Sequence, residues 1–314
     1  MTIDALTAAL VAMVAVSAPV LLAGIGELLA ERTGVINLGV EGMIVVGAAS
    51  SVIATSYYSN PWFGMLMAMI VAGSFGFLFA ITTVWLRANQ ILAGLAFLVL
   101  GTGLAGFVGA SHAGSIETAR FDRVPVPFLS DIPVIGSALF NQPVPVYIAL
   151  LLPILAHVLL YRTRHGLGIR AVGEDPGAAD IAGIKVRWLQ TIYVCIGSAL
   201  AGAAGAHISL GIVHQWTEGV SSGRGWIAIA VVIFASWRPL RFLFGGVLFA
   251  GTYALGFVGQ ANGWPIPPPF LSMVPYVVTL VVLIVASGRG HGAHQAGHSF
   301  APRGLGVAFE RRAR

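Results

Sequence analysis

The sequence has few charged residues, and this shortage limits the class of protein to which it can belong. Asp, Glu, Lys and Arg make up 9% of its 314 residues, whereas a soluble domain carries about 25%. Because 57% of the residues are apolar, the chain cannot cover itself with groups that water solvates. A soluble protein is therefore excluded, and the chain is expected to lie in a lipid bilayer.

Cysteine and polar linkers are equally scarce. The single cysteine, Cys195, lies inside an apolar run, which excludes a disulfide framework and a cysteine metal site. No polar stretch separates two cores, so we expect one membrane domain, residues 1–287, and a basic cytoplasmic tail, residues 288–314. The tail histidines stand among Gly, Ala, Gln and Arg, and we interpret this segment as a mobile polar tail without a metal site.

Nine apolar runs predict an all-α, polytopic membrane helix bundle of about nine transmembrane helices, within a range of eight to ten. Most runs reach the roughly 17 to 25 residues that cross about 30 Å of hydrocarbon. Gly225–Trp237 is too short for this and is expected to be half-inserted or broken. The runs are Thr7–Gly26, Val35–Tyr57, Trp62–Leu86, Gln90–Ala110, Val144–Tyr161, Leu189–Val213, Gly225–Trp237, Leu240–Gln260 and Leu271–Ser287.

The basic residues predict the orientation of these spans. When Lys and Arg are assigned to alternate loops, all of the 17 except Arg120, Arg123 and Arg224 fall on one side. Positive residues are retained on the cytoplasmic side, so the N-terminus is predicted outside and the C-terminus in the cytoplasm. Because the basic residues are scattered in small groups between apolar runs, they form no basic patch that would bind nucleic acid.

One internal loop, residues 162–187, carries the signals of a short helix. Asp175 is a favourable N-cap, Pro176 suits the first helical position, and Gly183 can end the helix in a left-handed conformation. A helix of about two turns is only marginally stable alone in water. We therefore expect it to pack against its own membrane domain or against a partner, although an ordinary connector is an equal alternative at this point.

A second signal is the stretch Glu31–Met43, ERTGVINLGVEGM. Asn37 and Glu41 lie four residues apart, on one helix face, and Glu41 is roughly 10 Å into its span. A buried carboxylate at this depth costs about 2.5 kcal/mol or more unless it is paired or hydrated. Glu41 is expected to have a structural or pathway-lining role, and proton coupling is the alternative.

A third stretch, Gly219–Trp237, enters the membrane from the opposite side and is also interrupted by glycine. Paired broken segments of opposite direction are typical of an inverted repeat around a central pathway, and chance similarity is an equal alternative. The small residues Ser198, Gly202 and Ala206 form a stripe that favours close helix packing. No Walker A sequence is present, and the Gly101–Gly106 GxGxxG lies inside a span, so neither ATP hydrolysis nor dinucleotide binding is expected.

Three stretches together resemble the permease subunits of bacterial ABC importers for nucleosides and simple sugars, within the ribose and branched-chain amino acid permease family. They are Glu31–Met43, the loop GLGIRAVGEDPGAADIAGIKV and the later SGRGWIAIAVVIFASWRP. The resemblance extends from about Leu21 to Tyr253. It implies a non-enzymatic membrane subunit without cofactors of its own, since ATP and Mg²⁺ bind a separate ATPase.

The resemblance also implies partners and site residues. The partners are the ABC ATPase, a second and non-identical permease, an extracytoplasmic substrate-binding protein and the bilayer of the bacterial inner membrane. The helix within Glu174–Ile184 would couple to the ATPase, through Arg170, Glu174, Asp175, Pro176, Ala178, Ala179 and Gly183. Candidates for the translocation path or gate are Asn37, Glu41, Asn89 and Gln90. A proton-driven secondary transporter that uses Glu41 is the alternative function, and a membrane enzyme is a remote third.

Overall fold

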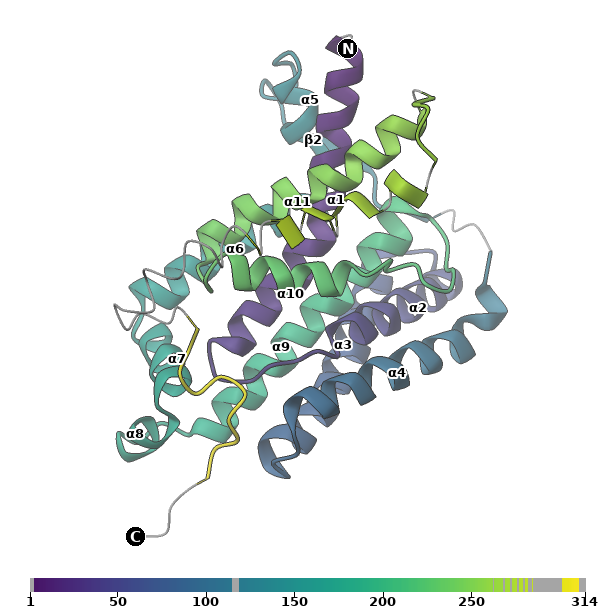
Figure 1. Ribbon diagram of the computed structural model, residues 1–314. Helices are drawn as coiled ribbons and strands as arrows, with labels where there is room; N and C mark the ends of the chain where they lie inside the picture. The colour runs from purple at the N-terminus through teal and green to yellow at the C-terminus, as the bar shows by residue number, and fades with distance from the viewer. Residues whose placement is uncertain are drawn as a thin grey trace.

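The computed structural model shows a helical bundle with a small β-ribbon in its described residues (Figure 1). The structure describes residues 3–114, 119–261, 263–267, 269–271, 273–275, 277–278, 280–281, 284 and 301–310. Its helices are α1 (Ile3–Glu31), α2 (Val40–Tyr58), α3 (Pro61–Ala80), α4 (Gln90–Gly109), α5 (Ile135–Phe140), α6 (Val144–Arg162), α7 (Arg164–Glu174), α8 (Pro176–Ile181), α9 (Val186–His207), α10 (Arg224–Phe234) and α11 (Pro239–Ala261). The π-turns η1 (Ile81–Trp85) and η3 (Ile208–Ile212) extend α3 and α9, and a 3₁₀ turn, η2 (Ala110–His112), follows α4.

Seven helical segments in the described part of the chain are long and apolar enough to cross a bilayer. They are Leu6–Glu31, Val40–Tyr58, Pro61–Trp85, Gln90–His112, Val144–Arg162, Val186–Ile212 and Pro239–Gln260. Each coincides with one of the predicted spans, which confirms an all-α polytopic bundle. The short seventh run, Gly225–Trp237, forms α10, with 11 residues, and the ninth, Leu271–Ser287, lies partly outside the described residues.

Two predicted helix boundaries at the start of the chain are wrong. α1 continues past Gly26 to Glu31, and α2 begins at Val40 rather than Val35. The intervening chain is kept out of a helix by Asn37, whose side-chain oxygen accepts a hydrogen bond from Gly39 N at 3.0 Å. Such an Asx turn competes with helical hydrogen bonding. Hydropathy does not report this competition, so the apolar pattern alone placed the start of the helix too early.

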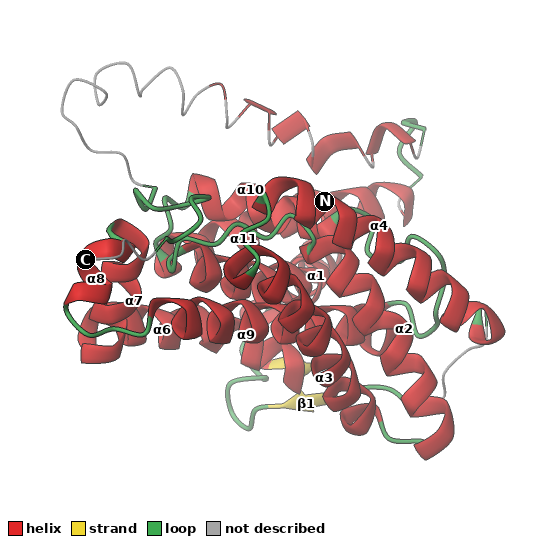
Figure 2. Cartoon of the chain, turned by 90° about the horizontal axis from the view of Figure 1, so that it is seen from below, coloured by secondary structure: helices red, strands yellow, loops and turns green. Residues whose placement is uncertain are grey.

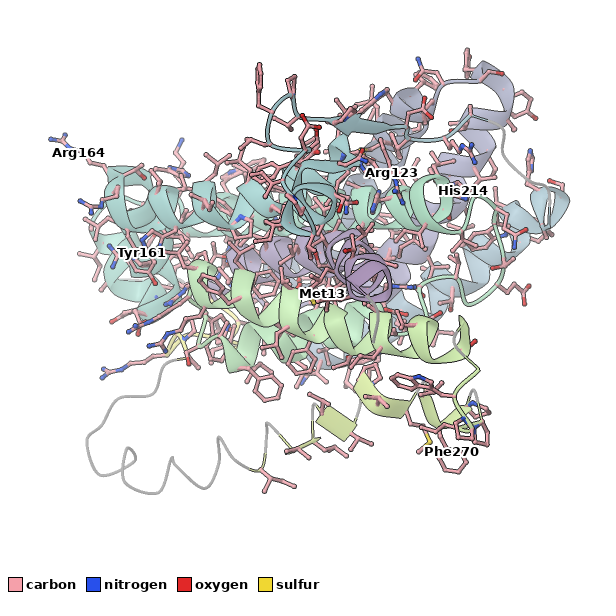
Figure 3. The ribbon with its side chains drawn as sticks, turned by 90° about the horizontal axis from the view of Figure 1, so that it is seen from above. Met13, Arg123, Tyr161, Arg164, His214 and Phe270 are labelled. Atoms are coloured by element: carbon pink, nitrogen blue, oxygen red, sulfur yellow. The ribbon has the colours of Figure 1, made fainter. Side chains whose placement is uncertain are left out.

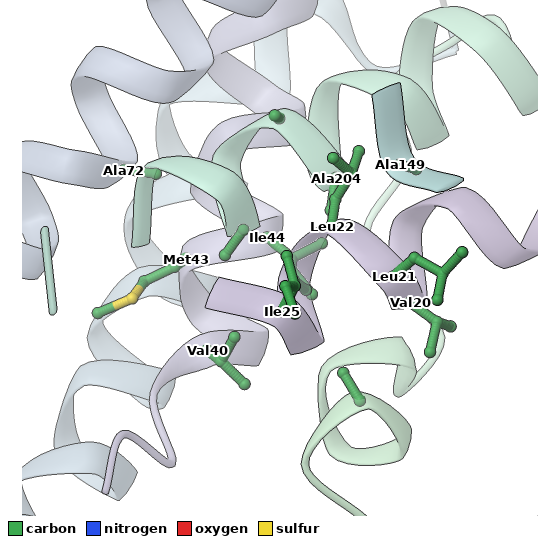
Figure 4. Close-up of a cluster of buried hydrophobic side chains, with 14 of the residues drawn as sticks. Val20, Leu21, Leu22, Ile25, Val40, Met43, Ile44, Ala72, Ala149 and Ala204 are labelled. Atoms are coloured by element: carbon green, nitrogen blue, oxygen red, sulfur yellow. The ribbon is translucent and has the colours of Figure 1, made fainter. Parts of the chain in front are cut away.

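The core of the bundle is formed where α9 packs against α1, α2 and α3. Side chains from α1, α2, α3, α6 and α9 meet in one buried cluster, shown in part in Figure 4. Small residues let these helices approach closely. A Cβ added at Gly26 would lie 2.7 Å from Gly197 Cα, and one added at Gly47 would lie 2.5 Å from Gly202 Cα. The predicted packing role of the stripe through Gly202 is confirmed.

Replacing Gly47 by valine is expected to lower the thermal unfolding midpoint of the purified protein by several degrees. The new side chain meets the α9 backbone rather than a flexible side chain, and overpacking a tight core costs about 1–3 kcal/mol. The matched control is Gly103→Val on α4, because a Cβ at Gly103 meets nothing within 4 Å. Equal midpoints for the two variants would contradict the close α2–α9 contact.

The bundle has two distinct ends, and Figure 3 shows Tyr161 and Arg164 at one and His214 and Phe270 at the other. We call the first the basic end. It carries the α1–α2 and α3–α4 turns, α7, α8 and the α10–α11 turn. The opposite end carries α5 and the ribbon of β1 (Arg123–Pro125) and β2 (Asn141–Pro143), seen in yellow in Figure 2. The two strands are antiparallel, with Val124 opposite Gln142.

Candidate functional site

The N-termini of α2 and α10 meet inside the bundle, and the side chain of Glu41 joins them. Its Oε1 accepts hydrogen bonds from Ser221 Oγ at 2.6 Å and from Gly223 N at 2.9 Å. Its Oε2 accepts one from Gly225 N at 2.6 Å. The first amides of a helix have no partner within the helix, and they carry its partial positive charge. Glu41 therefore supplies the negative cap that α10 lacks in its own sequence.

This junction lies near the middle of the membrane. Gly42, next to Glu41, packs against Gly101, where a Cβ would lie 2.9 Å from Gly42 O. Gly101 is eleven residues into α4, or about 16 Å at 1.5 Å per residue. Since the hydrocarbon core is about 30 Å thick, Glu41 stands about halfway across. Non-helical backbone at this depth is tolerated only where protein or a water-filled cavity surrounds it.

α10 is a half-helix that begins at this midpoint. Its 11 residues cover about 16 Å, which is half the hydrocarbon core, and end near the basic end. The preceding loop, residues 213–223, comes in from the opposite end. On the other side, residues 32–39 enter from the basic end before α2 begins. Such pairs of discontinuous segments frame the central site of many transporters.

A cavity of about 590 Å³ lies directly beside the junction. Three elements form it: the start of α2, one face of α4, and the loop before α10. Its polar groups are two carboxylates and three hydroxyls, and two aromatic side chains lie in its wall. The lining residues are Glu41, Val45, Thr102, Gly103, Gly106, Phe107, Trp216, Glu218, Gly219, Ser221, Ser222 and Gly223.

The α4 wall of this cavity is open to the surroundings of the isolated chain. Phe107 is 84% exposed, and Thr102 and Gly103 are exposed on the same helix. Glu218, across the cavity, is also exposed. A carboxylate that faces lipid costs free energy, so Glu218 needs to be shielded from lipid. In a single chain the cavity is therefore not fully enclosed.

Of the four residues predicted for the path or gate, the structure places Glu41 in the cavity wall and the others elsewhere. Gln90 is buried at the basic end, where its Oε1 accepts a hydrogen bond from Ile36 N at 2.8 Å. Asn89 is the exposed N-cap of α4, accepting from Ile91 N and Leu92 N. Asn37 shapes the α1–α2 turn. These three side chains support the turns from which α2 and α4 begin.

A cluster of buried charged residues that the sequence analysis did not single out holds the α1–α2 turn to the α10–α11 turn. Glu27 Oε1 accepts a hydrogen bond from Asn37 N at 2.8 Å. Glu31 Oε2 accepts one from Trp237 Nε1, and Arg32 donates through Nη2 to Trp237 O at 2.8 Å. Glu27 and Glu31 are 2% exposed. The sequence did contain a signal for this cluster. Glu27 and Glu31 are two acidic residues four positions apart in a chain with few charged residues.

Arg32 sits at the membrane edge of this cluster. Burial lowers the pKa of its guanidinium, an effect that the hydroxyl of Tyr161 and the carboxylate of Glu174 oppose. Arg32 also donates to Tyr161 Oη at 3.3 Å. At the opposite end, burial and then the charge of Arg120 lower the pKa of His214.

The short helix predicted in the 162–187 loop is present as α8, with the predicted ends. Asp175 is its N-cap, and Asp175 Oδ1 accepts a hydrogen bond from Ala178 N at 2.9 Å. Pro176 is its first residue, and Gly183 follows it with φ +88°. The preceding helix α7 was not predicted. Thr163 caps it by accepting from Gly166 N at 2.9 Å.

The residues of α8 divide into a free face and a packed face. Ala178 is exposed and Ile181 is 76% exposed, so this side is open to a partner. Ala179 is buried against Val172 and Val186. Of the other predicted coupling residues, Glu174 is exposed, and Arg170 lies over the Tyr161 ring at 5.2 Å. Arg170 thus faces the membrane domain.

The described residues contain no group of three or more His, Cys, Asp or Glu side chains that could hold a metal ion. The tail histidines, His291, His294 and His298, lie outside the described residues. The arrangement is that of a helical membrane protein with a central cavity between two half-inserted segments, which is the form of a transport permease.

A family comparison agrees with this geometry. Residues 9–283 match the model for the permease component of branched-chain amino acid transport systems. The chain belongs to this family. It is therefore the membrane permease subunit of an ATP-driven ABC transport system, which works with an ATPase and a substrate-binding partner. It is not the ATPase, and the proton-driven alternative is not favoured.

Individual relatives cover nearly the whole chain. A nucleoside ABC transporter permease of Lactococcus lactis is 34% identical over 95% of each chain. A guanosine ABC transporter permease of Bacillus subtilis is 31% identical over 93% of each. A Haloferax volcanii protein named as a glucose ABC transporter permease is 38% identical over 85% of this chain and 87% of its own length.

Among solved structures, an inward-facing metal-chelate type ABC transporter has a similar fold. The TM-score is 0.51 at 13% identity, over 88% of this chain and 84% of that one. At this identity the likeness concerns the fold alone. It is consistent with the helical bundle described above.

Proposed function

We propose that the chain moves nucleosides or simple sugars inward through the cavity beside Glu41. The observation that carries this proposal is the mid-membrane junction of α2 and α10 with a cavity of about 590 Å³ next to it. That volume falls within the roughly 300–1,000 Å³ typical of small-molecule sites. Relatives named for nucleosides, guanosine, glucose and galactofuranose support the substrate class.

The lining suits a neutral, hydroxylated ligand. Glu218, Thr102 and Ser222 offer oxygen atoms to sugar hydroxyls, and Phe107 offers an aromatic face to a base or a sugar ring. Few polar groups in a mostly small-residue wall give weak affinity. Weak binding is sufficient when a separate receptor captures the ligand and delivers it.

The basic end faces the cytoplasm in this proposal, because positive residues are retained there. The N-terminus is then outside and the C-terminus inside the inner membrane. In this proposal α8 is the coupling helix, and its exposed face, with Ala178 and Ile181, docks the ATPase. ATP and Mg²⁺ bind that subunit. The substrate-binding protein docks at the opposite end, near α5 and the β-ribbon.

A second permease covers the open face of α4 in this proposal. The cavity is incomplete along Thr102, Gly103 and Phe107, and lipid there would meet the carboxylate of Glu218. A partner helix that closes this side removes the exposed charge from lipid. We propose a non-identical permease as that partner, so that the pathway lies between two different chains.

The mechanism follows from the positions of the N-termini of α2 and α10. Closure of the ATPase on ATP moves α8, and the bundle changes between inward-open and outward-open forms around the cavity. Because α2 and α10 begin at the same point, a shift of one N-terminus relative to the other opens or closes the cavity. Glu41 is the link between them.

The proposal is tested by reconstitution. The permease pair, the ATPase and the receptor are placed in proteoliposomes, and uptake of labelled guanosine, uridine, ribose and glucose is measured with and without ATP inside. We expect ATP-dependent uptake of one of these ligands. Calorimetry on the receptor identifies the preferred ligand independently. Uptake that follows an imposed proton gradient without ATP would overturn the proposal.

Glu218→Ala is expected to reduce uptake about tenfold at low substrate concentration. The variant loses the main carboxylate that faces the open cavity, and a lost hydrogen bond to a charged group is worth about 1.5–3 kcal/mol. Glu218→Gln, which keeps an acceptor of the same length, is the matched variant and is expected to retain more activity. Initial uptake rates check this, and wild-type rates for Glu218→Ala would remove Glu218 from the path.

A further inference from the structure

The C-terminal segment Ala301–Glu310 crosses the basic end and joins three separated parts of the chain. Gly304 N donates to Gly173 O at 2.8 Å, at the end of α7, and Gly306 N donates to Gly34 O at 3.0 Å, in the α1–α2 turn. Glu310 forms an ion pair with Arg87, after η1, at 2.8 Å. Figure 1 shows this segment in yellow beside α7. The sequence predicted a mobile polar tail, and this part of it is instead packed.

Side-chain burial along the segment supports a fixed position. Pro302 is buried, and Ala301 and Leu305 pack against the main core. Phe309 packs against the small cluster that contains Val172 and Ala179. This cluster is the one that holds α7, α8 and the start of α9 together. The C-terminal segment thus completes the packing beneath α8.

The backbone contacts depend on glycine on both sides. A Cβ at Gly34 would lie 3.1 Å from Gly304 O, and one at Gly304 would lie 2.9 Å from Gly173 O. Gly306 has φ +78° and lies close to Ile36. Gly34 in the turn, and Gly304 and Gly306 in the segment, are therefore needed for the segment to reach the α1–α2 turn and α7 at once. A polar tail that merely rested on the surface would not require them.

We propose that residues 301–310 are a positioning strap that fixes α7 and α8 to the α1–α2 turn. The proposal rests on the proposed role of α8 in coupling. Motion imposed on α8 reaches Gly34 through the strap, and the turn that contains Gly34 leads directly into α2 and Glu41. Without the strap, α8 keeps its contacts with α7 and α9 but loses its direct link to the turn before α2.

The position of the strap is tested by hydrogen exchange on the purified full complex. A chain that ends at Phe300 lacks the strap, and one that ends at Glu310 lacks only the final four residues and is the matched control. We expect amide exchange in residues 164–182 and 32–39 to rise at least tenfold in the first variant and to stay at the wild-type rate in the second. Unchanged exchange in the first variant overturns the inference and leaves the proposed transport function intact.

A point variant tests the coupling role in case the shortened chain does not assemble. Gly304→Val places a side chain against Gly173 O, whereas Gly168→Val on α7 is the control, since a Cβ there makes only an ordinary contact at 3.7 Å. We expect uptake per ATP hydrolysed to fall about tenfold in Gly304→Val, with the ATPase still bound, and to stay unchanged in Gly168→Val. Wild-type uptake per ATP in Gly304→Val overturns the positioning role. Loss of ATP-driven uptake in the wild-type complex would instead count against the proposed function.

Discussion

Replacing Glu41 by alanine is expected to reduce uptake more than a hundredfold. The carboxylate accepts hydrogen bonds from Ser221 Oγ, Gly223 N and Gly225 N, and its loss leaves these donors without that acceptor in the middle of the membrane. Each hydrogen bond to a charged group is worth about 1.5–3 kcal/mol, and about 1.4 kcal/mol corresponds to a factor of ten. The loss of two of the three is therefore sufficient for this effect.

The same junction is tested from the α10 side by Gly225→Ala. A Cβ at Gly225 would lie 2.6 Å from Glu41 Oε2 and 2.8 Å from Glu41 Cα, so it must separate the two helix N-termini. We expect this variant to share the defect of Glu41→Ala although it changes no charge. Agreement between the two variants would assign the effect to the junction rather than to proton transfer by Glu41.

The control for both variants is Ser74→Ala on α3, outside the cavity. Ser74 is exposed, and its Oγ donates to Ile70 O in its own helix at 2.8 Å, so its removal leaves the α2–α10 junction intact. Uptake by this variant is expected within about threefold of wild type, a change under about 1 kcal/mol. Initial rates in proteoliposomes, normalised to the amount of folded protein, provide the measurement. Half the wild-type rate or more in Glu41→Ala would show that the junction is dispensable.

Ala178→Arg is expected to abolish both ATPase association and uptake. Ala178 is exposed on the free face of α8, and a long charged side chain there blocks close packing in a partner groove. The permease itself should fold normally, because surface substitutions away from special features change stability by about 0.5 kcal/mol or less. Co-purification of the ATPase and ATP-dependent uptake are the two measurements.

The choice of residue matters for this test. Ala179→Arg would unfold the cluster beneath α8, since Ala179 is buried, and it could not separate docking from folding. Ala88→Arg is the matched control, because Ala88 is exposed in the α3–α4 turn at the same end and lies outside α8. We expect normal uptake from Ala88→Arg. Normal ATPase binding by Ala178→Arg would remove α8 from the coupling interface.

Sequence patterns were informative where a feature is local. Seven of the nine apolar runs coincide with candidate spans in the described part of the chain, because a bilayer requires about 20 consecutive apolar residues of any helix that crosses it. The ends of α8 were predicted because Asp175, Pro176 and Gly183 start or end a helix through effects on the backbone of residues close to them in sequence. α7 was missed because its 11 residues include three glycines, and glycine is a poor helix former. Its stability comes from packing on α6.

Long-range pairing could not be read from the sequence. Nothing near Glu41 indicates that its partners are Ser221, Gly223 and Gly225, about 180 residues away. The three polar residues Asn37, Asn89 and Gln90 were predicted as candidates for the translocation path or gate, and the structure uses them in the turns. The strap at residues 301–310 was missed because a glycine-rich, polar sequence is compatible with a free tail and equally with a segment that docks through its backbone.

The sequence alone determined that this chain lies in a membrane, that it is built of helices, and that it contains a short helix between Glu174 and Ile184. These features follow from hydrophobic transfer and from helix capping, which depend on composition and nearest neighbours. Only the tertiary structure decided where the cavity lies, what holds Glu41, and which face of α8 is free. Those depend on which distant backbone groups come together, because a buried hydrogen-bonding group must find its partner in space rather than along the chain.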